Sequence, residues 1–141
     1  MSPTTTHYSG RCLCGAIQFE IEAFESRIAH CHCKMCQRFH GAAFSTFGEV
    51  KIEHLHWHSG ESLLKHYEAE NGTRRSFCQR CGSSLLFRSP YNIEEGTIEV
   101  ALAALDHAEG LVPDAHIYLE SQAPWIEVSD TLKKYPRYRE A

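Results

Sequence analysis

The chain has 141 residues, of which 43% are hydrophobic and 23% are charged. This is the composition of an ordinary globular protein, and it excludes wholesale disorder. The formal net charge is −4, and a negative surface repels phosphate backbones, so nucleic acid is not an expected partner.

The beginning of the chain, MSPTTTHYSG, is polar. It contains neither the basic segment nor the apolar segment of a signal peptide, and no later apolar run approaches the length that crosses a bilayer. We therefore expect a soluble, cytoplasmic protein with no membrane partner and with a flexible N-terminus over residues 1–7. The seven cysteines are an odd number in close groups, which favours metal binding over disulfides in such a chain.

Alternation of apolar and polar residues predicts the first strand. Ile17, Phe19 and Ile21 recur at every second position, as in a strand with one buried face. A turn is expected at Gly48-Glu49. Further short strands are predicted at residues 44–47, 50–53, 65–68, 76–78, 83–88 and 97–102.

Helical signals are few. One or two turns are expected from Lys34 to His40, ended by Gly41, and Pro90, Asn92 and Gly96 mark a connection between two strands. We therefore predict a mainly β fold of short antiparallel strands clamped by zinc, with at most one or two short helical turns.

Two cysteine pairs have the spacing of a structural metal site. In an extended backbone, Cys12 and Cys14 point to the same face. Cys78 and Cys81 have the spacing of a zinc knuckle. Together they predict one closed four-thiol zinc site that joins distant parts of the chain. The alternative is four buried, apolar cysteines without metal.

The remaining cysteines, Cys31, Cys33 and Cys36, offer only three sulfurs. Reactive zinc sites keep three protein ligands and leave one position open, so this group predicts a metal for chemistry. The alternation places His30 and His32 on the opposite face, where they are expected to support the site. In the alternatives, a histidine from elsewhere closes a second structural site, or Cys33 and Cys36 form a redox pair.

Other histidines have simpler explanations. His54, His56 and His58 alternate, so on a strand they would share one face and could bind a metal, but the polarity of an exposed hairpin explains them as well. For His116, a hydrogen-bonded core histidine and a role in a functional site are equally good explanations.

These motifs resemble the family of glutathione-dependent formaldehyde-activating enzymes, also called the centromere protein V/GFA domain, which has an Mss4-like zinc fold. The resemblance covers residues 8–127, which we take as the domain, and leaves 128–141 as a C-terminal tail. The matching segments are Gly10-Arg11-Cys12-Leu13-Cys14-Gly15, His30-Cys31-His32-Cys33-Lys34-Met35-Cys36, Gly41-Ala42-Ala43-Phe44, Ser59-Gly60-Glu61-Ser62-Leu63, Tyr67, Arg75-Ser76-Phe77-Cys78-Gln79-Arg80-Cys81-Gly82-Ser83, Pro113-Asp114-Ala115-His116-Ile117 and Trp125.

The resemblance implies two zinc ions and a carbon–sulfur lyase activity. The structural zinc would be held by Cys12, Cys14, Cys78 and Cys81. The catalytic and more labile zinc would be held by Cys31, Cys33 and Cys36. The implied reaction adds a thiol such as glutathione to formaldehyde or a related small aldehyde, with a water or His32 as a candidate proton donor to the product oxygen. The alternative is a zinc-stabilised, non-catalytic interaction module, because Mss4-like scaffolds also bind partners.

Arginines near the cysteines are candidates for binding the carboxylates of glutathione. Arg38, Arg74 and Arg75 have this position, but solvated charge or pairing with Glu68 and Glu70 explains each of them equally well, so none is assigned to the site. In the tail, basic and aromatic residues interleave as in some binders of single-stranded nucleic acid, and a solvated tail is the expectation we adopt. These residues are Lys133, Lys134, Tyr135, Arg137, Tyr138 and Arg139.

Overall fold

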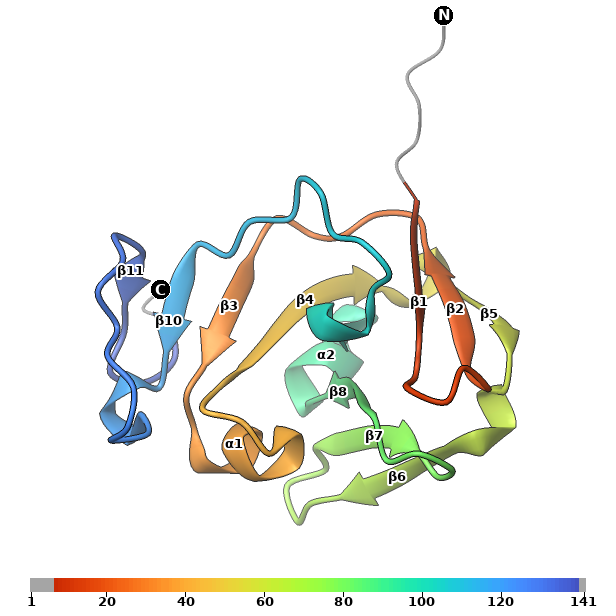
Figure 1. Ribbon diagram of the computed structural model, residues 1–141, viewed down its shortest axis with the longest axis horizontal. Helices are drawn as coiled ribbons and strands as arrows, with labels where there is room; N and C mark the ends of the chain where they lie inside the picture. The colour runs from red at the N-terminus through yellow and green to blue at the C-terminus, as the bar shows by residue number, and fades with distance from the viewer. Residues whose placement is uncertain (1–6, 140–141) are drawn as a thin grey trace, which may run out of the picture.

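The computed structural model describes residues 7–139, so the predicted flexible N-terminus lies outside the described residues except for His7 (Figure 1). The strands are β1 (Tyr8–Arg11), β2 (Gln18–Ile21), β3 (Ile28–Cys31), β4 (Ser45–Lys51), β5 (Leu55–Ser59), β6 (Leu64–Glu68), β7 (Arg74–Cys78), β8 (Ser84–Arg88), β9 (Thr97–Ala101), β10 (Ala115–Ile117) and β11 (Lys133–Lys134). The α-helices are α1 (Lys34–His40) and α2 (Pro90–Glu95), and short 3-10 helices span Ile52–His54, Glu61–Leu63, Leu102–Ala104 and Leu119–Ser121. The predicted mainly β fold is confirmed.

The strands form two open sheets. The smaller sheet has the order β1-β2-β5, and the larger one has the order β11-β10-β3-β4-β9-β8-β7-β6. Neighbouring strands are antiparallel except at β10, which runs parallel to both β3 and β11. Buried residues of both sheets meet in one apolar cluster. It includes Ile17, Phe19 and Ile21, each at most 1% exposed, as the alternation predicts.

Strand β4 corrects one prediction. The turn expected at Gly48-Glu49 does not exist, because β4 runs without interruption from Ser45 to Lys51 and pairs with β3 and β9. Gly48 has a packing role instead: a Cβ atom there would lie 2.5 Å from a ring carbon of Phe24. A glycine inside a strand often marks such a close approach, and the sequence alone does not distinguish it from a turn.

Helix α1 has the predicted bounds. Cys33 is its N-cap, with the backbone N–H of Cys36 donating to the Cys33 sulfur at 3.3 Å, and Gly41 ends it in the left-handed conformation with φ 61°. Helix α2 was not predicted, although its Ser89 and Asn92 form a capping box. Within residues 7–139, no helix is long and apolar enough to span a membrane.

The segment after residue 127 is attached to the larger sheet. Strand β11 extends it beyond β10, and the Tyr118 N–H donates to the Arg137 carbonyl at 2.9 Å. Arg139 binds both carboxylate oxygens of Asp114, at 2.8 and 3.0 Å. These contacts bring the basic and aromatic residues of the expected tail against the domain.

Candidate functional site

The two distant cysteine pairs meet in one cluster. Cys12 and Cys14 follow β1 in the smaller sheet, whereas Cys78 ends β7 in the larger sheet and Cys81 lies in the turn after it. All four Sγ atoms lie within 4.8 Å of one another, with 3.6 Å between Cys12 and Cys14 and 3.9 Å between Cys14 and Cys78. Tetrahedral zinc with Zn–S bonds of about 2.3 Å needs sulfurs about 3.8 Å apart, so the cluster fits this ion.

Backbone amides surround these sulfurs. The Ile17 N–H donates to Cys12 Sγ at 3.3 Å, and the Arg80 N–H donates to Cys78 Sγ at 3.4 Å. The Ser83 hydroxyl oxygen lies 3.2 Å from Cys81 Sγ. Such donors stabilise negative charge on sulfur, which is the form in which a thiol binds metal.

The other three cysteines form a second cluster where β3 passes into α1. The Sγ atoms of Cys31, Cys33 and Cys36 lie within 4.8 Å of one another, and no fourth cysteine, histidine or carboxylate joins them within residues 7–139. Three soft sulfur ligands fit a zinc ion that keeps one position for a ligand from outside. Hydrogen bonds among the three thiols lower the pKa of Cys33 and raise that of Cys31.

The histidines next to this cluster in sequence pack against other rings. His30 and His32 pack with the rings of Phe44 and His116. His32 Nε2 lies 2.8 Å from His116 Nδ1, and His116 Nε2 lies 2.8 Å from a carboxylate oxygen of Asp130. Neither His30 nor His32 lines the cavity described next, so His32 is not placed to protonate a ligand there. His116 is a buried, hydrogen-bonded histidine, which is one of the two explanations that its sequence position allowed.

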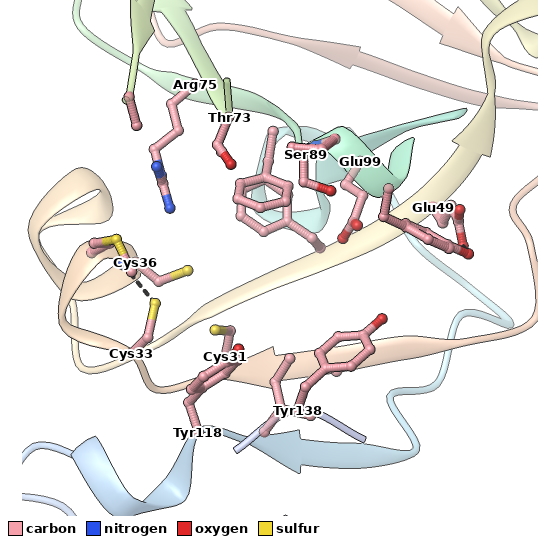
Figure 2. Close-up of a pocket in the computed structure, with 18 of the residues that line it drawn as sticks. Cys31, Cys33, Cys36, Glu49, Thr73, Arg75, Ser89, Glu99, Tyr118 and Tyr138 are labelled. Carbon is pink, nitrogen blue, oxygen red and sulfur yellow. Dashed lines mark hydrogen bonds between the residues drawn. The ribbon is translucent and has the colours of Figure 1, made fainter. Parts of the chain in front are cut away.

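The three-thiol cluster opens into a cavity of about 650 Å³. Figure 2 shows Cys31, Cys33 and Cys36 at one end and Glu49 toward the other. Strands β3, β4, β7, β8 and β9 supply its walls, together with residues 117–118 and 138–139. A ligand held at the sulfurs would therefore extend along this cavity, which is partly open to solvent.

Two carboxylates line the cavity away from the cysteines. Glu49 accepts a hydrogen bond from the Thr97 hydroxyl at 2.7 Å, and Glu99 accepts one from Asn92 Nδ2 at 3.4 Å. Burial, reinforced by the negative charge of Glu49, raises the pKa of Glu99 to about 7. Nothing in the local sequence pattern of β4 or β9 distinguishes either carboxylate from a solvated residue, so neither was predicted.

Tyr118 also lines the cavity and was not predicted. It is the one non-glycine residue with positive φ, at 59°, among those described, and Figure 2 shows it beside Cys31. A bulky residue in this conformation is an outlier, and such strain concentrates at functional sites. Its sequence context carries no signal for it.

The arginine candidates separate clearly. Arg75 is 7% exposed and lines the cavity, whereas Arg38 and Arg74 are exposed and do not.

The three alternating histidines do not form a metal site: His56 contacts Glu22, and His58 lies 3.0 Å from Glu20. His56 and His58 lie on the polar, exposed face of the smaller sheet, as the simpler explanation predicts, whereas His54 ends the 3-10 helix before β5 and does not share that face.

Fold and site together define a class of protein: small, mainly β domains with two cysteine clusters of the kind that binds metal. One cluster has four thiols, and the other has three and lies beside a cavity. The family of glutathione-dependent formaldehyde-activating enzymes matches residues 7–121. The chain belongs to this family.

Two individual proteins are similar to the chain. A Schizosaccharomyces pombe protein described as an uncharacterized lyase is 29% identical over 91 residues, which are 61% of this chain and 64% of that protein. The crystal structure of a Rhodobacter sphaeroides protein superposes with a TM-score of 0.61 at 24% identity, covering 74% of this chain and 97% of the other. At that identity, the second likeness concerns the fold alone.

Proposed function

We propose that the protein is a zinc-dependent carbon–sulfur lyase-type enzyme that adds a thiol such as glutathione to formaldehyde or a related small aldehyde. The observation that carries this proposal is the three-thiol cluster, which has no fourth ligand among the described residues and opens into the 650 Å³ cavity. Membership of the family and the similarity to a protein described as a lyase support it.

The two cysteine clusters are assigned different tasks in this proposal. Cys12, Cys14, Cys78 and Cys81 hold a structural zinc ion, and Cys31, Cys33 and Cys36 hold a second, more labile one. When bound at the three thiols, Zn²⁺ would supply an open coordination position and lower the pKa of a thiol there. Because the three sulfur ligands lie at one end of the cavity, the reaction would take place at that end.

The chain's own side chains would orient the reactants and donate a hydrogen bond to the carbonyl oxygen. Addition forms a carbon–sulfur bond, opens the carbonyl double bond and transfers the thiol proton to the former carbonyl oxygen. The Tyr118 hydroxyl is protonated at neutral pH, since burial raises its pKa above the ordinary 10, and it can donate a hydrogen bond to this oxygen. The cavity walls bring the two reactants together in a defined orientation.

An interaction module is the alternative function. Such a module would need its second metal closed by protein atoms, and a cavity that adjoins an incomplete ligand set favours the enzyme. Within our proposal, the family domain spans residues 8–127, and the segment after it completes the larger sheet and the cavity. The protein acts in the cytoplasm on small molecules rather than on nucleic acid or membranes.

The test is the exchange of formaldehyde with glutathione, followed by NMR on the zinc-loaded protein. We expect the wild type to exceed the rate in buffer and Cys33→Ser to fall back to it. Tyr118→Phe should lower the rate by roughly 10- to 100-fold, the effect of losing a positioned proton donor. Tyr67→Phe, at an exposed position outside the cavity, is the matched control and should leave the rate unchanged.

Equal rates in the wild type, in Cys33→Ser and in buffer would overturn the enzyme proposal. A second metal closed by a fourth protein ligand, and inaccessible to added thiols, would favour the interaction module instead.

A further inference from the structure

Arg75 is a buried cation in the wall of the cavity. It lies in β7, is 7% exposed, and its guanidinium carbon is 5.1 Å from the centre of the Phe87 ring on the neighbouring strand β8. Stacking on an aromatic ring holds the planar guanidinium in one orientation. Figure 2 shows this group pointing from β7 into the space near Cys36.

Among the described residues, the Arg75 guanidinium has neither a hydrogen-bonded nor an ion-paired protein partner. Its Nε is buried without a hydrogen-bond acceptor. The arginines that form ion pairs within residues 7–139 are others: Arg11, Arg137 and Arg139. A guanidinium stays charged at any physiological pH, and a buried charge without a partner destabilises the folded state. The position of Arg75 therefore favours an anion that comes from outside the chain.

The location of Arg75 indicates what this anion belongs to. The guanidinium and the three-thiol cluster line the same cavity, so one molecule can reach both. Charges of both signs line the cavity elsewhere: Glu49, Glu99, Arg27 and Arg139. Arg139 is paired with Asp114, and Arg27 is exposed, so Arg75 is the buried cation that lies near the sulfurs. A thiol held at the sulfurs is therefore within reach of this guanidinium through its own anionic group.

We infer that Arg75 binds a carboxylate of the thiol substrate and makes the cavity selective for carboxylate-bearing thiols over neutral ones. This inference rests on the proposed function, since it takes the sulfur of the same molecule to lie at Cys31, Cys33 and Cys36. The planar guanidinium can hold both oxygens of a carboxylate at once, which a point charge cannot.

The experiment measures binding without turnover. S-methylglutathione, which has no free thiol to react, and its diester, in which both carboxylates are blocked, are titrated into the zinc-loaded protein by calorimetry. We expect the wild type to bind the acid roughly 10- to 100-fold more tightly than the diester, the usual worth of a charge-assisted hydrogen bond. The protein's net charge of −4 attracts the cationic diester, so general electrostatics would act against this preference.

Variants assign the preference to one side chain. Arg75→Gln should bring the affinity for the acid down to that for the diester, and Arg75→Lys should retain part of the preference because it keeps the charge. Arg74→Gln is the matched control, since Arg74 is the adjacent residue of β7 but is exposed and outside the cavity. It should keep the full preference.

Several outcomes would overturn the inference. If the wild type binds the acid and the diester equally well, the inference is excluded, even if Arg75→Gln fails to fold. If Arg75→Gln loses the same amount of affinity for both ligands, the role of Arg75 is structural and the inference is excluded as well. The proposed function fails separately: a wild type that prefers the acid but does not accelerate formaldehyde exchange keeps the carboxylate site and loses the reaction.

Discussion

Glu99 shows how one residue couples the cavity to pH. Its carboxyl lies beside Glu49 and receives one hydrogen bond, from Asn92, while the nearby Arg139 is held by Asp114. Burial therefore dominates and raises its pKa from the ordinary 4.5 to about 7. In the folded protein, Glu99 keeps a proton that the unfolded chain releases near pH 4.5.

This difference predicts that Glu99→Gln stabilises the protein at alkaline pH. Between about pH 4.5 and 7 the folded state binds more protons than the unfolded state, so the contribution of Glu99 to stability is present below this window and is lost as the pH rises through it. We expect the variant to exceed the wild type by on the order of 1 kcal/mol at pH 8 and by little at pH 5, as measured by urea unfolding.

Glu94→Gln is the matched control, because Glu94 is exposed on α2. Its stability should follow that of the wild type at both pH values. A Glu99→Gln variant whose advantage does not grow between pH 5 and pH 8 would contradict the assigned titration.

At the scale of elements, β4 lies at the centre of the larger sheet and has Phe24 packed over its Gly48. The ring of Phe24 is held in turn by an edge-on contact with Tyr8, with 5.4 Å between ring centres. A methyl group on Gly48 would also come within 3.2 Å of Leu102. There is no free space on this side of the strand.

We therefore expect Gly48→Ala to destabilise the protein by about 1–3 kcal/mol, the usual cost of overpacking a core. Thermal unfolding measures the effect. In a double-mutant cycle with Phe24→Ala, the second substitution should relieve much of the loss, because it removes the atoms that clash. Strictly additive effects would mean that the two residues do not meet as described.

At the scale of the molecule, the two cysteine clusters differ in how distant the segments are that they join. The four-thiol cluster joins the smaller sheet to the larger one, and it links Cys14 with Cys78, which are 64 positions apart. The three-thiol cluster lies within one short stretch at the start of α1. Only the first closes a long loop, whose entropy a bound metal must offset.

Loss of the four-thiol site should therefore unfold the domain. Structural zinc contributes on the order of 10–16 kcal/mol in small finger peptides, which matches or exceeds the 5–15 kcal/mol stability of an ordinary domain. We expect Cys12→Ser to lose its fold by circular dichroism and Cys33→Ser to stay folded. Native mass spectrometry should find two zinc ions in the wild type and one in Cys33→Ser.

The reverse pattern, a folded Cys12→Ser and an unfolded Cys33→Ser, would show that the two metals are assigned the wrong way round. Treatment with a chelator gives an independent measure, since the three-thiol site should release its zinc first while the circular dichroism spectrum is still that of the folded protein.

The sequence by itself determined the features that depend on short spacings. Alternation identified the buried face of Ile17, Phe19 and Ile21, and the bounds of α1 followed from its position before Gly41. The division of the cysteines into four and three was also readable, because ligand spacing is a local property of the chain. Where a local signal had two explanations, as at Gly48, the sequence suggested the wrong one.

Only the tertiary structure decided what surrounds the three-thiol cluster. Arg75, Glu99 and Tyr118 come from β7, β9 and the residues after β10, and the cavity exists because the order of the sheet brings these segments together. In sequence, Arg75 is indistinguishable from its neighbour Arg74. In the folded sheet, Arg75 faces the cavity and Arg74 faces solvent. Because Arg75 is buried without a hydrogen-bond partner for its Nε, it is a candidate for binding an anion.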